Sequence, residues 1–123
     1  MMLFKLLVIA HATYIMITAV WPIIDIQSFM LVTGPKTDIW LVKTVGALLI
    51  PVSLCMYSYL RTNTIDIPII ILGIGIAVAF ISVDVYYSMA DVISNIYLID
   101  AAVELVFLIG WVLIALRKFK QPK

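Results

Sequence analysis

This chain has little charge and very few residues that carry covalent or metal chemistry. Only 12% of its 123 residues are charged, Cys55 is the single cysteine and His11 the single histidine. One cysteine excludes an intrachain disulfide and a cysteine-rich metal site, and the apolar neighbours of Cys55 predict a buried, inert thiol. A net charge of +1 leaves no basic surface to neutralise phosphates, so no nucleic-acid partner is expected. No nucleotide loop, nucleophile elbow or zinc motif occurs. The sequence therefore predicts that the protein has no cofactor and no metal, and it identifies no catalytic residue.

What the chain does have is apolar length. Hydrophobic residues make up 65% of it and the mean hydropathy is +1.20, more than a soluble domain of this size could bury. Four runs, at about 3–22, 39–60, 67–88 and 96–116, each have roughly the 20 residues that cross a bilayer. The sequence therefore predicts an all-α integral membrane four-helix bundle, with residues 1–123 as a single transmembrane domain. Thr37 and Asp38 precede the second run as a cap, and Pro51 predicts a kink within it.

The basic residues predict how the bundle is oriented. Lys5, Arg61 and a basic tail flank one side of the runs, whereas Asp25 lies with other acidic residues in the two opposite loops. Cytoplasmic loops carry an excess of lysine and arginine, so both termini are expected in the cytoplasm. His11 and further polar residues interrupt the first run, which favours a retained span over a cleaved signal. The tail residues are Arg117, Lys118, Lys120 and Lys123, and the opposite loops also hold Lys36, Asp38 and Asp91.

The two halves of the chain resemble each other. The segment 37–43 (TDIWLVK) is similar to 94–100 (SNIYLID), and both precede an apolar run that ends in Leu-Arg. Two duplicated helical hairpins of the same orientation would produce this pattern, as would chance similarity between apolar sequences. A duplication would place Lys43 and Asp100 at equal depth in equivalent helices.

Five ionisable side chains fall within the outer half or the middle of the runs, where exposure to lipid is costly. The helical spacing of each run places them on inward faces, together with aromatic side chains, which predicts a shared polar pocket open to the outside. The candidate ligand-binding or proton-relay residues are His11, Lys43, Asp84, Asp100 and Glu104, and the candidate lining residues are Tyr14, Trp40, Tyr87, Tyr97 and Trp111.

Each candidate also has a structural interpretation. Lys43 with Asp100 or Asp84 could form an ion pair that fixes helix register. His11 could shuttle protons or hydrogen-bond a neighbour such as Tyr14. The loop at 32–38 either forms a tight turn or, through Lys36 and the helix amides, binds an anion such as a lipid phosphate.

The segment VTGPKTDIWLVKTVG at 32–46 resembles a signature of uncharacterised small four-span bacterial membrane proteins, which implies the bacterial cytoplasmic membrane and no particular activity. A looser similarity is to the EXPERA superfamily of four-span proteins, which includes sterol isomerases and a drug-binding receptor. It involves Ala10-His11, Asp25-Ile26-Gln27, Trp40 and Lys43-Thr44. The second run lacks that family's acidic residue and the third lacks a histidine, so the resemblance implies a lipid-lined pocket and no isomerase mechanism.

These observations predict a multi-pass protein that binds a small amphipathic or lipid-like ligand, with Lys43, Asp84 and Glu104 at its polar head. An accessory or structural membrane subunit and a proton-coupled transporter are the alternatives. Membrane lipids are the expected surroundings, and a homo-oligomer or a larger membrane complex remains open.

Overall fold

The computed structural model describes residues 1–121 and consists of helices joined by short loops. Four of the helices are long and apolar enough to cross a membrane: α1 (Met2–Ile24), α3 (Ile39–Thr62), α4 (Ile67–Met89) and α5 (Tyr97–Lys120). The predicted all-α four-helix bundle is therefore confirmed. The basic end of the chain extends α5 one turn beyond the predicted span, because lysine and arginine favour helix and suit a helix C-terminus.

A fifth, short helix was not predicted. Helix α2 (Ile26–Thr33) begins directly after α1, in a segment expected to be loop. Asp25 ends α1 and caps α2, since its side chain accepts a hydrogen bond from the Ser28 amide at 3.3 Å. The Trp21 indole donates to the Ser28 hydroxyl at 2.8 Å and packs edge-on against Phe29. These contacts fold α2 back against the C-terminal end of α1.

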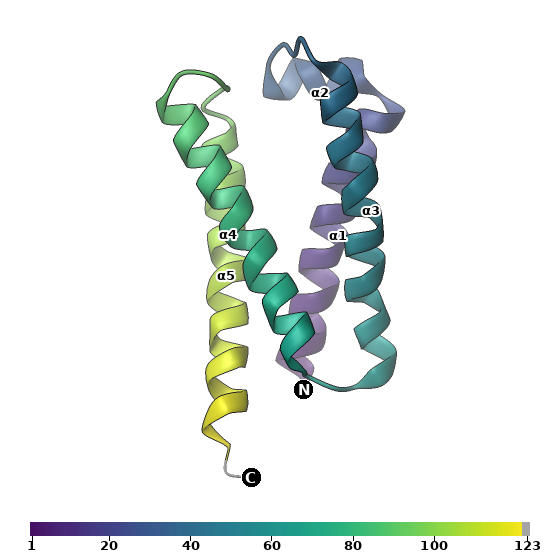
Figure 1. Cartoon of the computed structure of the whole chain (residues 1–123), viewed down its shortest axis with the longest axis vertical. Helices are drawn as coiled ribbons and strands as arrows, with labels where there is room; N and C mark the ends of the chain where they lie inside the picture. Colours follow the sequence, from purple (N-terminus) through teal and green to yellow (C-terminus); the bar gives the residue numbers. More distant parts are fainter. Residues whose placement is uncertain (122–123) are drawn as a thin grey trace.

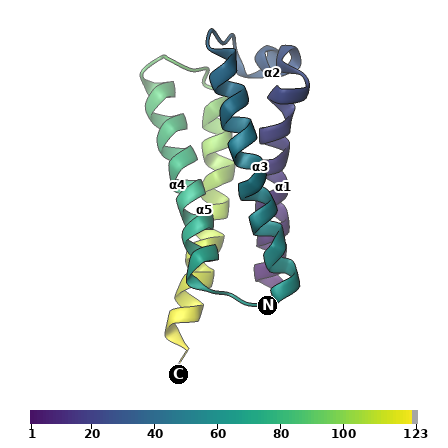
Figure 2. The same cartoon turned by 45° about the vertical axis from the view of Figure 1, so that its right-hand side comes forward.

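The long helices associate as two pairs, α1 with α3 and α4 with α5 (Figures 1 and 2). A glycine without a side chain allows a close contact in each pair, with the α1 backbone in one and with the Trp111 ring in the other. A Cβ on Gly46 would lie 2.4 Å from the Ala19 carbonyl oxygen, and one on Gly73 would lie 2.2 Å from the Trp111 ring. Such small residues let membrane helices pack tightly. The predicted hairpins are thus present, while their origin by duplication remains a prediction.

The two pairs meet in an apolar core at the end of the molecule that carries the chain termini, and they separate toward the opposite end (Figure 1). Helix α1 is central, and its buried residues Phe4, Val8 and Ile15 join residues of α3, α4 and α5. The buried stripe of α3 faces α1, and Cys55 falls off that stripe. The predicted burial of Cys55 is therefore wrong, and its side chain is exposed.

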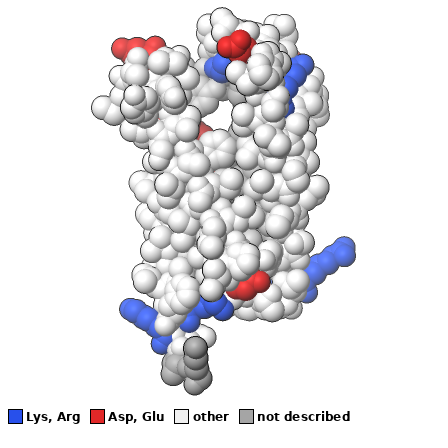
Figure 3. Space-filling view, in the orientation of Figure 1, with Lys and Arg blue, Asp and Glu red and all other residues white. Residues whose placement is uncertain are grey.

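Basic and acidic side chains show at both ends of the molecule (Figure 3). Both termini, Arg61 and the basic residues in the last turn of α5 lie at the end where the pairs meet (Figure 1). We call it the inner end and the opposite one the outer end. This arrangement agrees with an integral membrane protein whose basic flanks share one side, and the cytoplasmic location of that side stays a prediction. Lys123, part of the predicted basic tail, lies outside the described residues.

Candidate functional site

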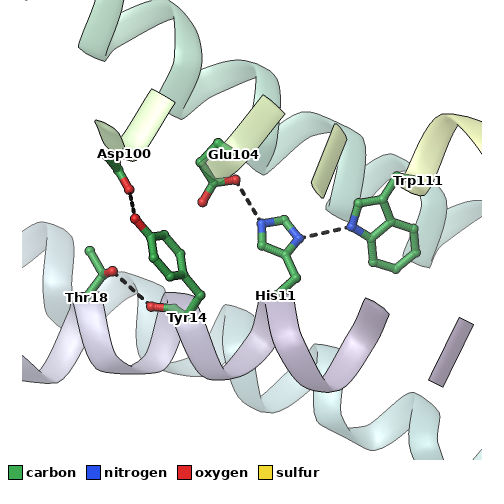
Figure 4. Close-up of polar contacts among 6 residues, drawn as sticks. All are labelled: His11, Tyr14, Thr18, Asp100, Glu104 and Trp111. Carbon is green, nitrogen blue, oxygen red and sulfur yellow. Dashed lines mark hydrogen bonds and ion pairs between the residues drawn. The ribbon is translucent and has the colours of Figure 1, made fainter. Parts of the chain in front are cut away.

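Three of the predicted side chains form a buried bridge between α1 and α5 at mid-depth. His11 Nε2 lies 2.9 Å from Glu104 Oε2, and the Trp111 indole Nε1 donates to His11 Nδ1 at 3.0 Å (Figure 4). Each of the three residues is at most 1% exposed. The Phe107 ring stacks on the imidazole with centroids 4.3 Å apart. At 1.5 Å per residue, His11 lies about 13 Å from the inner end of α1.

The hydrogen-bond inventory fixes the proton positions in this bridge. An indole N–H can only donate, so His11 Nδ1 accepts and the imidazole hydrogen resides on Nε2. Nε2–H then donates to Glu104, and both ring nitrogens are satisfied. Neither nitrogen is free for a ligand, which gives this bridge the character of a structural lock between the helix pairs.

A second contact joins the same two helices further out. The Tyr14 hydroxyl donates to Asp100 Oδ1, and the Thr18 hydroxyl donates to the Tyr14 carbonyl oxygen at 2.9 Å (Figure 4). Phe107 contacts the Tyr14 ring as well as His11. Tyr14 is therefore positioned by its own helix and by α5, with its hydroxyl committed to Asp100.

Asp84 is the unsatisfied member of the group. It lies on α4, is 3% exposed, and its Oδ2 has no hydrogen-bond partner among residues 1–121. A buried polar atom without a partner is rare in proteins and costs free energy of folding. Asp84 Oδ2 is therefore the one buried side-chain oxygen or nitrogen within residues 1–121 that no other described residue serves.

Asp84 and Asp100 both border a pocket of about 460 Å³ that lies between the helix pairs in the outer half. Figure 3 shows a notch between the two lobes of the outer end, with an acidic side chain at its floor. Most of the lining is apolar. The lining residues are Tyr14, Thr18, Trp21, Pro22, Phe29, Thr33, Lys36, Val42, Val45, Gly46, Leu49, Phe80, Val83, Asp84, Ile93, Ile96, Tyr97, Ile99 and Asp100.

The outer loop contributes a cross-connection at this pocket. Gly34 adopts a φ of +96°, which agrees with the predicted tight turn. Lys36 Nζ donates to the carbonyl oxygens of Thr33 and Gly34, and it lies 5.1 Å from the centroid of the Tyr97 ring. Lys36 thus links the α2–α3 loop to the start of α5, and its ammonium is already occupied by acceptors.

Several predicted site residues lie elsewhere. Lys43 is exposed and does not line the pocket, and the predicted Lys43–Asp100 pair is absent, because the one ion-pair contact in the described chain is His11–Glu104. Val42, Val45, Gly46 and Leu49 form the pocket-facing side of α3, and Lys43 falls off it.

Trp40 is 66% exposed and lies on the far side of α3 from the pocket. Tyr87 is 42% exposed and packs edge-on against Tyr86 at the outer end of α4. Of the five candidate lining residues, Tyr14 and Tyr97 line the pocket, while Trp111 belongs to the buried bridge.

The pocket also contains aromatic residues that sequence reasoning did not assign, above all Trp21 and Phe29. Their contribution depends on helix α2. The sequence does contain a pattern that indicates the start of this helix, because Asp25 followed three residues later by Ser28 resembles a helix cap before an apolar segment.

Among residues 1–121, no group of three or more histidine, cysteine, aspartate or glutamate side chains is placed to hold a metal ion. The charged or titratable groups that line the pocket are the carboxyl groups of Asp84 and Asp100, the hydroxyls of Tyr14 and Tyr97, and the engaged Lys36 ammonium. Comparison of the chain with protein-family models, curated proteins and solved structures finds no match, so the predicted family resemblances stay predictions and the site stands on its own residues.

Proposed function

We propose that this multi-pass membrane protein binds a small amphipathic molecule in the pocket between its helix pairs. The observation that carries the proposal is Asp84 Oδ2, a buried and unpartnered oxygen at the wall of an apolar pocket of about 460 Å³. Ligand sites commonly enclose about 300–1,000 Å³ and combine apolar walls with a few placed polar groups. A bound head group would supply the partner that Asp84 lacks.

The head group in this proposal contacts Asp84 and Asp100, with Tyr14 beside them. This differs from the expectation drawn from the sequence, because Lys43 faces away and Glu104 is engaged by His11. The apolar part of the ligand lies among Phe80, Val83 and the residues of α3 that line the pocket.

A proton-coupled transporter is supported less well. In the described chain the buried polar residues are His11, Thr33, Ser53, Asp84, Ser88 and Glu104. Ser53 donates to the Ala12 carbonyl oxygen, so it lies at the depth of His11. The buried polar residues thus end at that depth, and the core inward of it is apolar. A relay needs polar groups on both sides of the membrane centre.

Binding can be tested with three probes that share one apolar scaffold: 2-(naphthalen-2-yl)ethylamine, the matching alcohol and the matching carboxylic acid. Equilibrium dialysis against protein in zwitterionic lipid nanodiscs, with empty nanodiscs as baseline, measures saturable binding. We expect at least one probe to bind at one site per chain. Val42→Trp, which fills the pocket, should abolish that binding, whereas Leu48→Trp on the exposed side of the same helix should not.

Two results would refute the proposal. One is the absence of saturable binding for all three probes. The other is binding that survives Val42→Trp unchanged, since it would then take place outside the pocket. Either result would favour the accessory or structural subunit, in which the polar bridge only holds the helices together.

A further inference from the structure

The pocket floor is rich in hydrogen-bond acceptors and poor in donors. An ionised carboxylate only accepts, with about four lone-pair positions, and the floor has two carboxyl groups, Asp84 and Asp100. The donor provided there by the protein is the Tyr14 hydroxyl, which serves Asp100. Asp84 Oδ2 is buried and remains without a donor, and the Asp84 residue as a whole is 3% exposed.

The floor also lacks a positive charge. Lys36 is the one basic residue that lines the pocket, and its ammonium is held by the Thr33 and Gly34 carbonyl oxygens and the Tyr97 ring. No lysine or arginine within residues 1–121 lies in ion-pair contact with Asp84 or Asp100. Buried charges in proteins are paired or neutralised, so this pair of carboxyls requires a cation or a proton from outside the protein.

The walls above the floor suit an organic cation. Five aromatic residues line the pocket: Tyr14, Trp21, Phe29, Phe80 and Tyr97. Aromatic faces attract ammonium groups, by up to about 2 kcal/mol where water is excluded. Tyr97 already holds the Lys36 ammonium in this way. Apolar walls with aromatic faces and an acidic floor match a ligand that is both hydrophobic and positively charged.

We propose that the ligand of this pocket is a hydrophobic cation, a protonated amine on an apolar body, with its ammonium between Asp84 and Asp100. This inference rests on the proposed function and names its ligand class. An ammonium has three N–H donors and no acceptor, so it satisfies Asp84 Oδ2 and the free positions on Asp100 together. An alcohol offers a single donor, and a carboxylate is repelled by two like charges.

The three naphthyl probes separate the two proposals. We expect the amine to bind at least tenfold more tightly than the alcohol, and the acid not to bind. Asp84→Asn should weaken amine binding at least tenfold and alcohol binding by a clearly smaller factor, because asparagine keeps an acceptor oxygen but loses the charge. Asp91→Asn is the matched control, because Asp91 is an exposed acid at the same membrane face, does not line the pocket, and has a positive φ that asparagine tolerates. It should leave both affinities unchanged.

Equal affinities for amine and alcohol in the wild-type protein would overturn the cation inference while leaving pocket binding intact. Preference for the acid would overturn it too. The wild-type comparison needs no variant, so the inference stays testable if Asp84→Asn does not fold, and Asp100→Asn supplies a second substitution. Absence of binding of all three probes to the wild-type protein would instead refute the proposed function itself.

Discussion

Replacing Gly73 with alanine should disrupt the buried bridge without touching any of its hydrogen-bonding groups. A Cβ at this position would lie 2.2 Å from Trp111 Cε2 and 2.6 Å from the indole Nε1. Atoms cannot approach that closely, so the indole must move, and its N–H then leaves His11 Nδ1. Gly73→Ala therefore acts on His11 through Trp111.

The size of the effect follows from three contributions. Overpacking a close helix contact costs about 1–3 kcal/mol. Leaving the buried Nδ1 without its donor costs about 1–3 kcal/mol more. Alanine in place of glycine inside a helix returns about 1 kcal/mol. Together these contributions lower the free energy of unfolding by about 1–5 kcal/mol, and by the lower part of that range if Trp111 relaxes.

Gly75 offers a control in the same helix, two residues away. A Cβ there meets nothing within 4 Å, so Gly75→Ala should gain up to about 1 kcal/mol from helix propensity alone. The assay is helical circular dichroism during SDS titration in mixed micelles, which gives the free energy of unfolding for both variants. A Gly73→Ala protein as stable as the wild type, or equal losses in both variants, would refute the packing argument.

Three further outcomes follow from the same contacts. Glu104→Gln should keep an acceptor for His11 and leave probe binding within twofold. Glu104→Leu leaves the imidazole N–H without an acceptor and should lower the free energy of unfolding by about 1–3 kcal/mol in the same titration. Loss of probe binding in the glutamine variant would place Glu104 in the pocket. A double-mutant cycle of Lys43→Gln with Asp100→Asn should give a coupling energy near zero, because the two side chains form no ion pair. A coupling energy above about 0.5 kcal/mol would show that Lys43 and Asp100 interact after all. Cys55→Ala should change the free energy of unfolding by less than about 0.5 kcal/mol in the same titration, because an exposed side chain loses little packing, and a loss above about 2 kcal/mol would show that Cys55 is covered by the protein.

The spans were predictable because crossing a bilayer demands about 20 apolar residues, and hydropathy records that demand directly. The starts of α3 and α4 fall at the predicted residues, Ile39 and Ile67. Helix α2 was missed because a segment of eight residues between two spans carries no span-length signal, and its start depends on the Asp25 cap.

The azimuthal orientation of each helix was predictable only in part. Spacing placed His11, Tyr14 and Glu104 inward, where the structure has them near one another. It also placed Lys43 inward, but the rotation of α3 is set by the contact of Gly46 with Ala19, which turns Lys43 away. The contact between a small residue on one helix and the backbone of another depends on both helices. The periodicity of apolar residues within one helix therefore does not predict that contact.

The apolar core inward of His11 has a consequence for permeability. Within residues 1–121, the buried side chains of this core are apolar and offer no hydrogen-bond acceptor to water or a hydrated ion; they are Phe4, Val8, Met56, Ile69, Ile70 and Ile114. A molecule that enters from one side therefore meets a seal half-way through. Proteoliposomes that carry this protein should hold an imposed proton gradient as long as protein-free vesicles do, measured with an entrapped pH-sensitive dye. Faster decay would mean that the helix pairs part at the inner end as well.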